Sequence, residues 1–437
     1  MTGSLKHNFA KYVSFNILAS MGTSAYVLAD TFFVANGVGT DGLTALNLAI
    51  AVFSLMIAIG LMLGIGGATV FAINRARGEM EAGSRAYTIS LKTGLVIGLF
   101  LMVLGIFFSK GISLMLGANE QTLEMTDTYV KTIMCFAPVY IMNNMLVPFV
   151  RNDGRPKLAA IAVLIGNLTN IILDYVFVYP LQMGIFGAAL ATCVAPIITI
   201  GILSEHFVHR KNTFHFIKGK ITGTMGILKK IASLGVFAFV NEMANGIVIF
   251  VFNWLLLGLG GNIAVAAYGV IANISLVAVA TFTGISQGSQ PLISQAYGAG
   301  DEKSMSKVYK WGAVLALGIA TLLMAVVMLF DVEIANLFNK DGNSQLTLIA
   351  SSGLKIYFAG FFFAGLNIIT AGYMSAMEQG IRGFIISISR GLVAIIPAAI
   401  IMSMIWGITG VWLAFSVAEI ITLIISVASQ RSLRRSA

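Results

Sequence analysis

Four carboxylates stand well inside long apolar stretches of this sequence: Asp30, Asp174, Glu242 and Glu419. A charged side chain at the centre of a bilayer costs at least about 2.5–3.5 kcal/mol on insertion scales. Acids in such positions therefore mark a path for an ion or a substrate, unless the protein itself satisfies them. Their chemistry would be cation binding or reversible protonation, and the neighbouring residues indicate which acids could act together.

The two acids of the first half have polar neighbours on their own helices. The segment 167–174, NLTNIILD, places Asn170 and Asp174 on one helical face, and Tyr26 lies one turn before Asp30. Asp30 and Asp174 both fall near the outer ends of their predicted helices, so their depths match. Two carboxylates with amide oxygens alongside can bind a cation such as Na⁺, or share a proton because like charges repel. The alternative is that both acids only satisfy buried donors of the protein.

The second half offers a different set of polar residues. Glu242 shares a helical face with Asn245, and Glu419 is expected at a similar depth on the last helix. No lysine or arginine is expected within the membrane to neutralise either acid. Gln287 and Gln290 fall on the eighth helix, beside a proline that loosens it. We expect a second charge site for cationic substrate or protons; the alternative is a protonated pair that holds helices together.

The composition identifies a polytopic membrane protein. Of the 437 residues, 58% are hydrophobic and only 10% are charged, whereas roughly 25% are charged in a soluble domain. Crossing a bilayer takes about 20 apolar residues, and this criterion predicts twelve helices in an all-α fold. Their expected ranges are 9–36, 43–73, 86–109, 122–150, 157–179, 185–208, 232–258, 264–297, 306–330, 345–377, 383–404 and 409–430.

Lysine and arginine predict the orientation of these helices. Most of the 27 basic residues, including Arg390, fall on one side of the predicted membrane. The exceptions are Lys110, Lys131, Lys340 and Lys355. The positive-inside rule makes this side cytoplasmic, so both termini are expected in the cytoplasm. The formal net charge of +9 follows from this topology, and we expect no nucleic acid as a partner.

An internal repeat divides the chain into two lobes. GIFGAALATCVA at 184–195 recurs as GITGVWLAFSVA at 407–418. The predicted repeat contains six helices, so the lobes should be pseudo-symmetric about an axis along the membrane normal, with a cavity between them. We expect an N-terminal lobe at 1–208, a basic cytoplasmic linker at 209–230 and a C-terminal lobe at 231–437. Such repeats favour an alternating-access carrier.

An enzyme is not expected. The four histidines lie at the N-terminus or near the basic linker, so none is available within the predicted helices for catalysis or metal binding. Cys135 and Cys193 fall in apolar segments, which argues against a disulfide framework. No cofactor is expected beyond a coupling ion.

Three segments resemble the multidrug and toxic compound extrusion (MATE) family, most closely its bacterial members. They are YVLADTFFVANGVGTDGLTALNLA at 26–49, RNDGRPKLAAIAVLIGNLTNIILD at 151–174 and QPLISQAYGAGD at 290–301. The resemblance covers essentially the whole chain. It implies a monomeric secondary transporter in the inner membrane of a bacterium. Such a protein exports cationic or amphipathic drugs across the lipid bilayer in exchange for Na⁺ or H⁺, by antiport.

The resemblance also implies roles for individual residues. The coupling site would comprise Asp30, Asn144, Asn170, Asp174 and Thr192, with Na⁺ possible between Asp30 and Asp174. The substrate and second charge site would comprise Tyr26, Glu242, Asn245, Gln287, Gln290, Asn367 and Glu419. Asn367 stands where some members have an aspartate, and the first helix lacks the proline at which some members bend.

The alternative function is a flippase for lipid-linked oligosaccharides, which has a related fold. A flippase for an anionic headgroup should line its cavity with lysine or arginine. We expect every basic residue of this chain at a helix end, which favours drug export.

Overall fold

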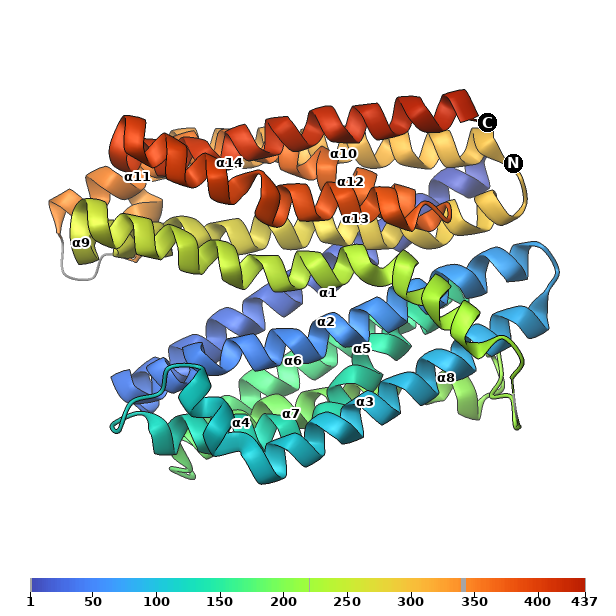
Figure 1. The fold of residues 1–437 in the computed structure, drawn as a ribbon, viewed down its shortest axis with the longest axis horizontal. Helices are drawn as coiled ribbons and strands as arrows, with labels where there is room; N and C mark the ends of the chain where they lie inside the picture. The colour runs from blue at the N-terminus through green and yellow to red at the C-terminus, as the bar shows by residue number, and fades with distance from the viewer. Residues whose placement is uncertain (1, 220, 339–342, 437) are drawn as a thin grey trace.

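The computed structural model describes residues 2–219, 221–338 and 343–436, and this part of the chain is helical without any strand (Figure 1). The first half contains α1 (Thr2–Gly37), α2 (Thr40–Ala76), α3 (Met80–Met115), α4 (Leu123–Cys135), α5 (Ala137–Asn152), α6 (Pro156–Val178), α7 (Gly184–Leu203) and α8 (Glu205–Val208). The second half contains α9 (Thr224–Gly298), α10 (Glu302–Leu337), α11 (Ser344–Ala359), α12 (Phe361–Ala376), α13 (Gly380–Ile388), the π-helix η1 (Ser389–Val393) and α14 (Ile395–Ser436).

The predicted twelve spans are confirmed. Within the described residues, eight helical stretches are long and apolar enough to cross a membrane, and the bent pairs α4–α5 and α11–α12 raise the number to ten. The 75-residue helix α9 turns back at Gly261, and α14 does so at Gly407, so each contains a further reversal. Both glycines have positive φ, 61° and 57°, where a side chain would be strained. The described residues therefore contain twelve spans.

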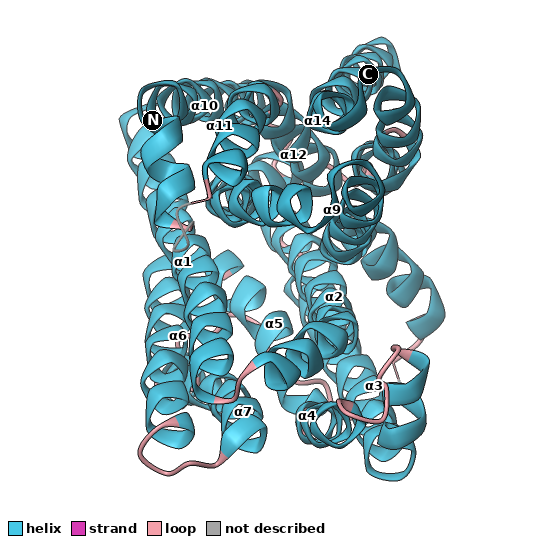
Figure 2. Ribbon diagram, turned by 90° about the vertical axis from the view of Figure 1, so that its left-hand side faces the viewer, coloured by secondary structure: helices cyan, strands magenta, loops and turns pink. Residues whose placement is uncertain are grey.

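The helices form two bundles that lie one above the other in Figure 1. Helices α2–α8 make one bundle and α9–α14 the other, while α1 runs between them and packs against both α6 and α9. Figure 2 shows the same arrangement along the helices, with α1 at the side where the bundles meet. Both termini lie at one end of the long axis. We call this end the basic face, and the other end the opposite face.

The chain between α8 and α9 is held against the first bundle by one buried carboxylate. Asp153, at the end of α5, accepts hydrogen bonds from Arg75 Nη1 at 2.9 Å and from the backbone N–H of Thr213 at 2.8 Å. The Thr213 hydroxyl also donates to it, and His206 Nε2 lies 2.8 Å from its Oδ2. Helix α9 begins at Thr224, so the non-helical part of the linker ends earlier than the expected residue 230.

Candidate functional site

The two carboxylates of the first half lie together between α1 and α6. Asp30 is 8% exposed and Asp174 is fully buried, and their charges are close enough to interact. The Oδ1 atom of each is buried and has no hydrogen-bond partner. Buried polar atoms are nearly always paired, so two unpaired carboxylate oxygens in one place point to a ligand such as a cation or a proton.

Asn170 and Thr192 complete the wall of this site. In the amide orientation that satisfies both of its polar atoms, Asn170 donates to Asp174 Oδ2 at 3.1 Å and accepts from the Thr192 backbone N–H at 3.2 Å. Both side chains are buried. The Thr192 hydroxyl donates to the carbonyl of Ala188 at 3.0 Å, in the preceding turn of α7. Three helices, α1, α6 and α7, therefore supply the site, and Asn170 fixes the orientation of Asp174.

Asn144 reaches this site only through other residues. Its amide donates to the carbonyl of Tyr140 at 3.0 Å, one turn earlier on α5. The Tyr140 hydroxyl donates in turn to the carbonyl of Thr192 at 2.7 Å. Tyr129 of α4 also contacts the Thr192 hydroxyl and lies near Asp30. Neither tyrosine stands out in the sequence, because an aromatic residue in an apolar helix is usually part of the core and gives no separate signal.

The chemistry of this site is that of a hard-cation or proton site. Carboxylate, amide and hydroxyl oxygens are the ligands that Na⁺ uses, and the unpaired Oδ1 atoms are available to it. The described part of the chain holds no cluster of three or more His, Cys, Asp or Glu residues, which a tightly bound transition metal would need. The oxygen atoms present fit a hard cation such as Na⁺, or a proton.

Tyr26 connects this site to the second half of the chain. Its ring lies near the charges of Asp30 and Asp174 and also near Glu242 of α9. Glu242 contacts the hydroxyl of Ser54 on α2, so it faces the first bundle across the space between the halves. Asn245, almost one turn further along α9, is exposed. Tyr26 and Glu242 thus lie where the two halves meet, and their role as a substrate surface stays a prediction.

Glu419 has a counter-ion, which corrects the expectation that no basic residue would neutralise it. Arg390 Nη2 donates to Glu419 Oε1 at 2.7 Å, and Asn367 donates to Oε2 at 2.8 Å. Ser426 donates to Asn367 Oδ1 at 2.8 Å. The charge pattern predicts Arg390 on the cytoplasmic side, but it lies in η1, in the interior of the stretch Gly380–Leu433. Glu419 and Asn367 therefore have polar partners within the second bundle, separate from Glu242, while Arg390 Nε is buried without a partner.

Gln287 and Gln290 lie nearer the basic face, where they join the two halves. Arg151 Nη1 donates to Gln287 Oε1 at 2.9 Å, and Asn152 donates to Gln290 Oε1 at 3.0 Å. Gln290 donates to the Thr69 hydroxyl of α2 at 2.8 Å. We call these five residues the polar clasp. The structure does not bring its two glutamines together with Glu242, so they form a separate feature.

The fold and the site define a class: a twelve-helix membrane carrier of two six-helix halves, with two acids buried in one of them. The chain belongs to the MatE family, whose sequence pattern matches residues 16–176 and 238–401. The protein is therefore a multi-pass membrane transporter of the MATE multidrug efflux family, as the three sequence segments predicted. The two matched ranges fall in the two halves of the chain.

Curated relatives and solved structures agree with this assignment. The Multidrug export protein MepA of Staphylococcus haemolyticus is 27% identical over 420 residues, which is 96% of this chain and 91% of that protein. MepA of Staphylococcus saprophyticus is 26% identical over 407 residues, covering 93% and 89%. A structure described as the outward-facing conformation of a multidrug resistance MATE family transporter has a TM-score of 0.93 at 22% identity, covering 99% and 96%. At that identity, the structural likeness establishes the fold alone.

Proposed function

We propose that the protein is an antiporter that exports cationic or amphipathic small molecules in exchange for Na⁺ or H⁺. The observation that carries this proposal is the pair Asp30 and Asp174, which lie together with unpaired buried oxygens on two neighbouring helices. A bound cation relieves the repulsion between the two carboxylates. It therefore stabilises the state of the carrier in which the two carboxylates lie close together and are shielded from water.

The polar clasp supports alternating access as the mechanism. Its hydrogen bonds tie α5 and α2 of the first bundle to α9 of the second, nearer the basic face, while Asp30 and Asp174 lie near the opposite-face ends of α1 and α6. A carrier closed at the basic face would load its cation from the opposite side. Opening the clasp would then release that cation at the basic face, which the positive-inside rule assigns to the cytoplasm of a bacterium.

Tyr26, Glu242 and Asn245 are proposed to contact the substrate. An acid and an aromatic ring at the meeting of the two halves suit an organic cation, because the carboxylate pairs with its charge and the ring with its apolar body. The names of the MepA relatives, multidrug export proteins, support this substrate class. We propose that the protein acts as a monomer in the inner membrane and needs no cofactor other than the coupling ion.

The flippase alternative has less support. Its distinguishing feature would be basic residues that line the cavity for an anionic headgroup. Arg390 does lie inside a span, contrary to the expectation that every basic residue is at a helix end. Its charge is already neutralised by Glu419 at 2.7 Å, and Arg151 donates to Asn16 and Gln287. Arg390 is therefore not available to an anionic headgroup, whereas Arg151 keeps a buried Nε and Nη2 without partners and is the side chain on which the flippase alternative rests.

Ethidium efflux from vesicles with separately imposed Na⁺ and pH gradients tests the proposal and identifies the ion. We expect one of the two gradients to drive efflux in the wild-type protein. Asp30→Asn should slow that efflux at least about tenfold, within the range of typical coupling free energies. Asp41→Asn, which removes an exposed acid from the start of α2, is the matched control and should leave efflux unchanged. Equal efflux in Asp30→Asn and wild type would refute the proposal.

A further inference from the structure

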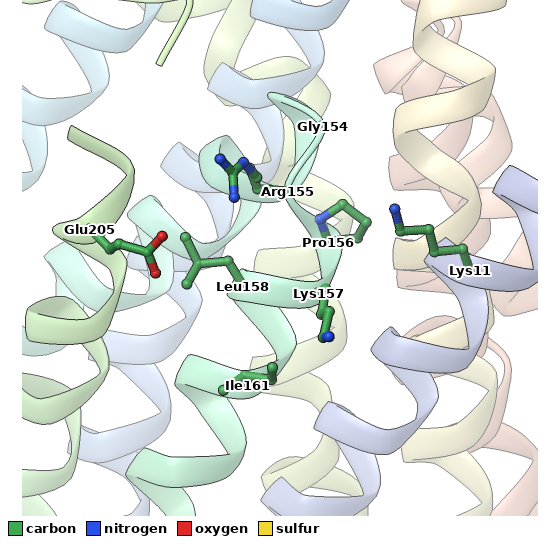
Figure 3. Close-up of a pocket in the computed structure, with 8 residues that line it drawn as sticks. All are labelled: Lys11, Gly154, Arg155, Pro156, Lys157, Leu158, Ile161 and Glu205. Carbon is green, nitrogen blue, oxygen red and sulfur yellow. The ribbon is translucent and has the colours of Figure 1, made fainter. Parts of the chain in front are cut away.

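A cavity opens at the basic face between the ends of α1 and α6. Its volume is about 320 Å³, which falls within the range of small-molecule sites. Figure 3 shows Lys11 of α1 on one side, Pro156 and Lys157 of α6 in the middle, and Glu205 of α8 on the far side. Its lining includes Lys11, Arg155, Lys157, Leu158, Ile161 and Glu205.

The charges around this cavity are mostly positive and unpaired. Lys11, Arg155 and Lys157 form no ion pair with any residue that the structure describes. The one acid in the lining, Glu205, lies 3.9 Å from Lys211, so its charge already has a partner. The cavity therefore presents three free cations around a single anionic group.

The remaining wall of the cavity is apolar. Leu158 and Ile161 lie three residues apart on α6, so they line the same helical face just below the charged rim. In a protein that spans a bilayer, this combination occurs where headgroups meet acyl chains. Basic cavities between transmembrane helices at the cytoplasmic leaflet are suited to anionic lipid headgroups.

We propose that this cavity binds the phosphate headgroup of an anionic phospholipid from the leaflet at the basic face. Lys11 and Lys157 contact the phosphate from α1 and α6, Arg155 adds a third cation, and the first part of an acyl chain lies against Leu158 and Ile161. A water-soluble phosphate would use the same cations but gain nothing from the apolar wall. The lipid is therefore the occupant that uses the whole lining.

A lipid in this cavity is expected to affect transport, because of where the cavity lies. Helices α1 and α6, which the headgroup bridges at the basic face, also carry Asp30 and Asp174 near their other ends. A lipid that holds these helices together favours the geometry in which the two acids meet. This consequence rests on the proposed antiport function, whereas lipid binding itself does not.

Lipid binding is measured on the purified full-length protein in a neutral detergent, by native mass spectrometry during titration with single phospholipids. We expect phosphatidylglycerol to bind at least about tenfold more tightly than phosphatidylcholine, as the attraction of two or three lysine and arginine side chains provides. Equal affinity for the two lipids would overturn the proposal. So would displacement of phosphatidylglycerol by glycerol phosphate at the same concentration, because the site would then prefer a free phosphate.

Paired variants locate the binding. Lys11→Gln with Lys157→Gln should remove the preference for phosphatidylglycerol, while Lys11→Arg with Lys157→Arg should keep it. Lys303→Gln with Lys307→Gln is the control, because it removes two exposed charges from α10 at the same face. A preference that survives the glutamine pair, or that the control pair also abolishes, would refute this location. Because transport is not needed for this readout, its failure is distinct from failure of the antiport proposal.

Discussion

At the scale of single residues, acids buried in the two halves differ in their partners. Asp30 and Asp174 keep unpaired oxygens, whereas Glu419 is held by Arg390 and Asn367. The sequence predicted that Asp30 and Asp174 lie at the same depth in the membrane. Their two helices run in the same direction, and each acid falls near the outer end of its helix. The sequence could not predict the pair of Arg390 with Glu419, because the positive-inside rule places a basic residue at the cytoplasmic side and carries no information on a buried partner.

The Arg390–Glu419 pair should matter for stability. Arg390→Met leaves a buried carboxylate without its counter-ion, so we expect a loss of about 3–5 kcal/mol in the free energy of unfolding. Adding Glu419→Gln should recover a large part of that loss, because no buried charge then remains. Thermal unfolding of the purified variants in detergent measures both effects. A double variant less stable than Arg390→Met alone would contradict the assigned pairing.

At the scale of helices, twelve apolar runs were enough to predict the spans, because the bilayer fixes their length and composition. Breaks within continuous apolar sequence were harder to predict. Gly407 marks a reversal, and it falls in the gap between the expected spans 383–404 and 409–430. The bend within 122–150 lies at Phe136, next to Pro138 at the start of α5, inside what was expected to be one span. The role of Gln287 and Gln290 could not be predicted either, because their partners in the polar clasp are more than 130 residues away in sequence.

The reversal at Gly407 needs glycine. Its φ of 57° and ψ of −134° lie in a region that only glycine adopts easily, so Gly407→Ala should cost about 1–3 kcal/mol of stability. Gly318→Ala is the matched control: it lies within α10 with open space around its added methyl group. That control should be neutral or slightly stabilising. Chemical or thermal unfolding that finds Gly407→Ala more stable than Gly318→Ala would contradict the positive φ at Gly407.

The start of α10 offers a pH-dependent test outside the membrane. Asp301 accepts hydrogen bonds from the Ser304 backbone and hydroxyl, at 3.0 and 2.5 Å, which hold the pKa of its carboxyl below the ordinary value. The stabilisation is therefore present above the ordinary aspartate pKa and is lost as the pH falls through the lowered one. Asp301→Ala should speed amide hydrogen exchange in the first turn of α10 near neutral pH. Unchanged exchange would show that the cap contributes nothing.

At the scale of the whole molecule, the polar clasp should control which face is open. Gln290→Leu removes hydrogen bonds to Asn152 and Thr69, so the halves should separate more readily at the basic face. Spin labels at Glu79 and Lys303, both exposed at this face on different halves, would report the separation as a longer distance population. Gln121→Leu, in the exposed turn before α4, is the control. A distance distribution unchanged by Gln290→Leu would refute the clasp as a gate.

We propose that a cation bound between Asp30 and Asp174 couples inward movement of the ion to outward movement of the substrate. Proteoliposomes that contain Asp174→Asn test it most directly, with two readouts on one preparation: efflux driven by the ion gradient, and exchange of labelled for unlabelled substrate without a gradient. We predict that gradient-driven efflux falls at least about tenfold while substrate exchange persists. Gradient-driven efflux at the wild-type rate in this variant would contradict the account.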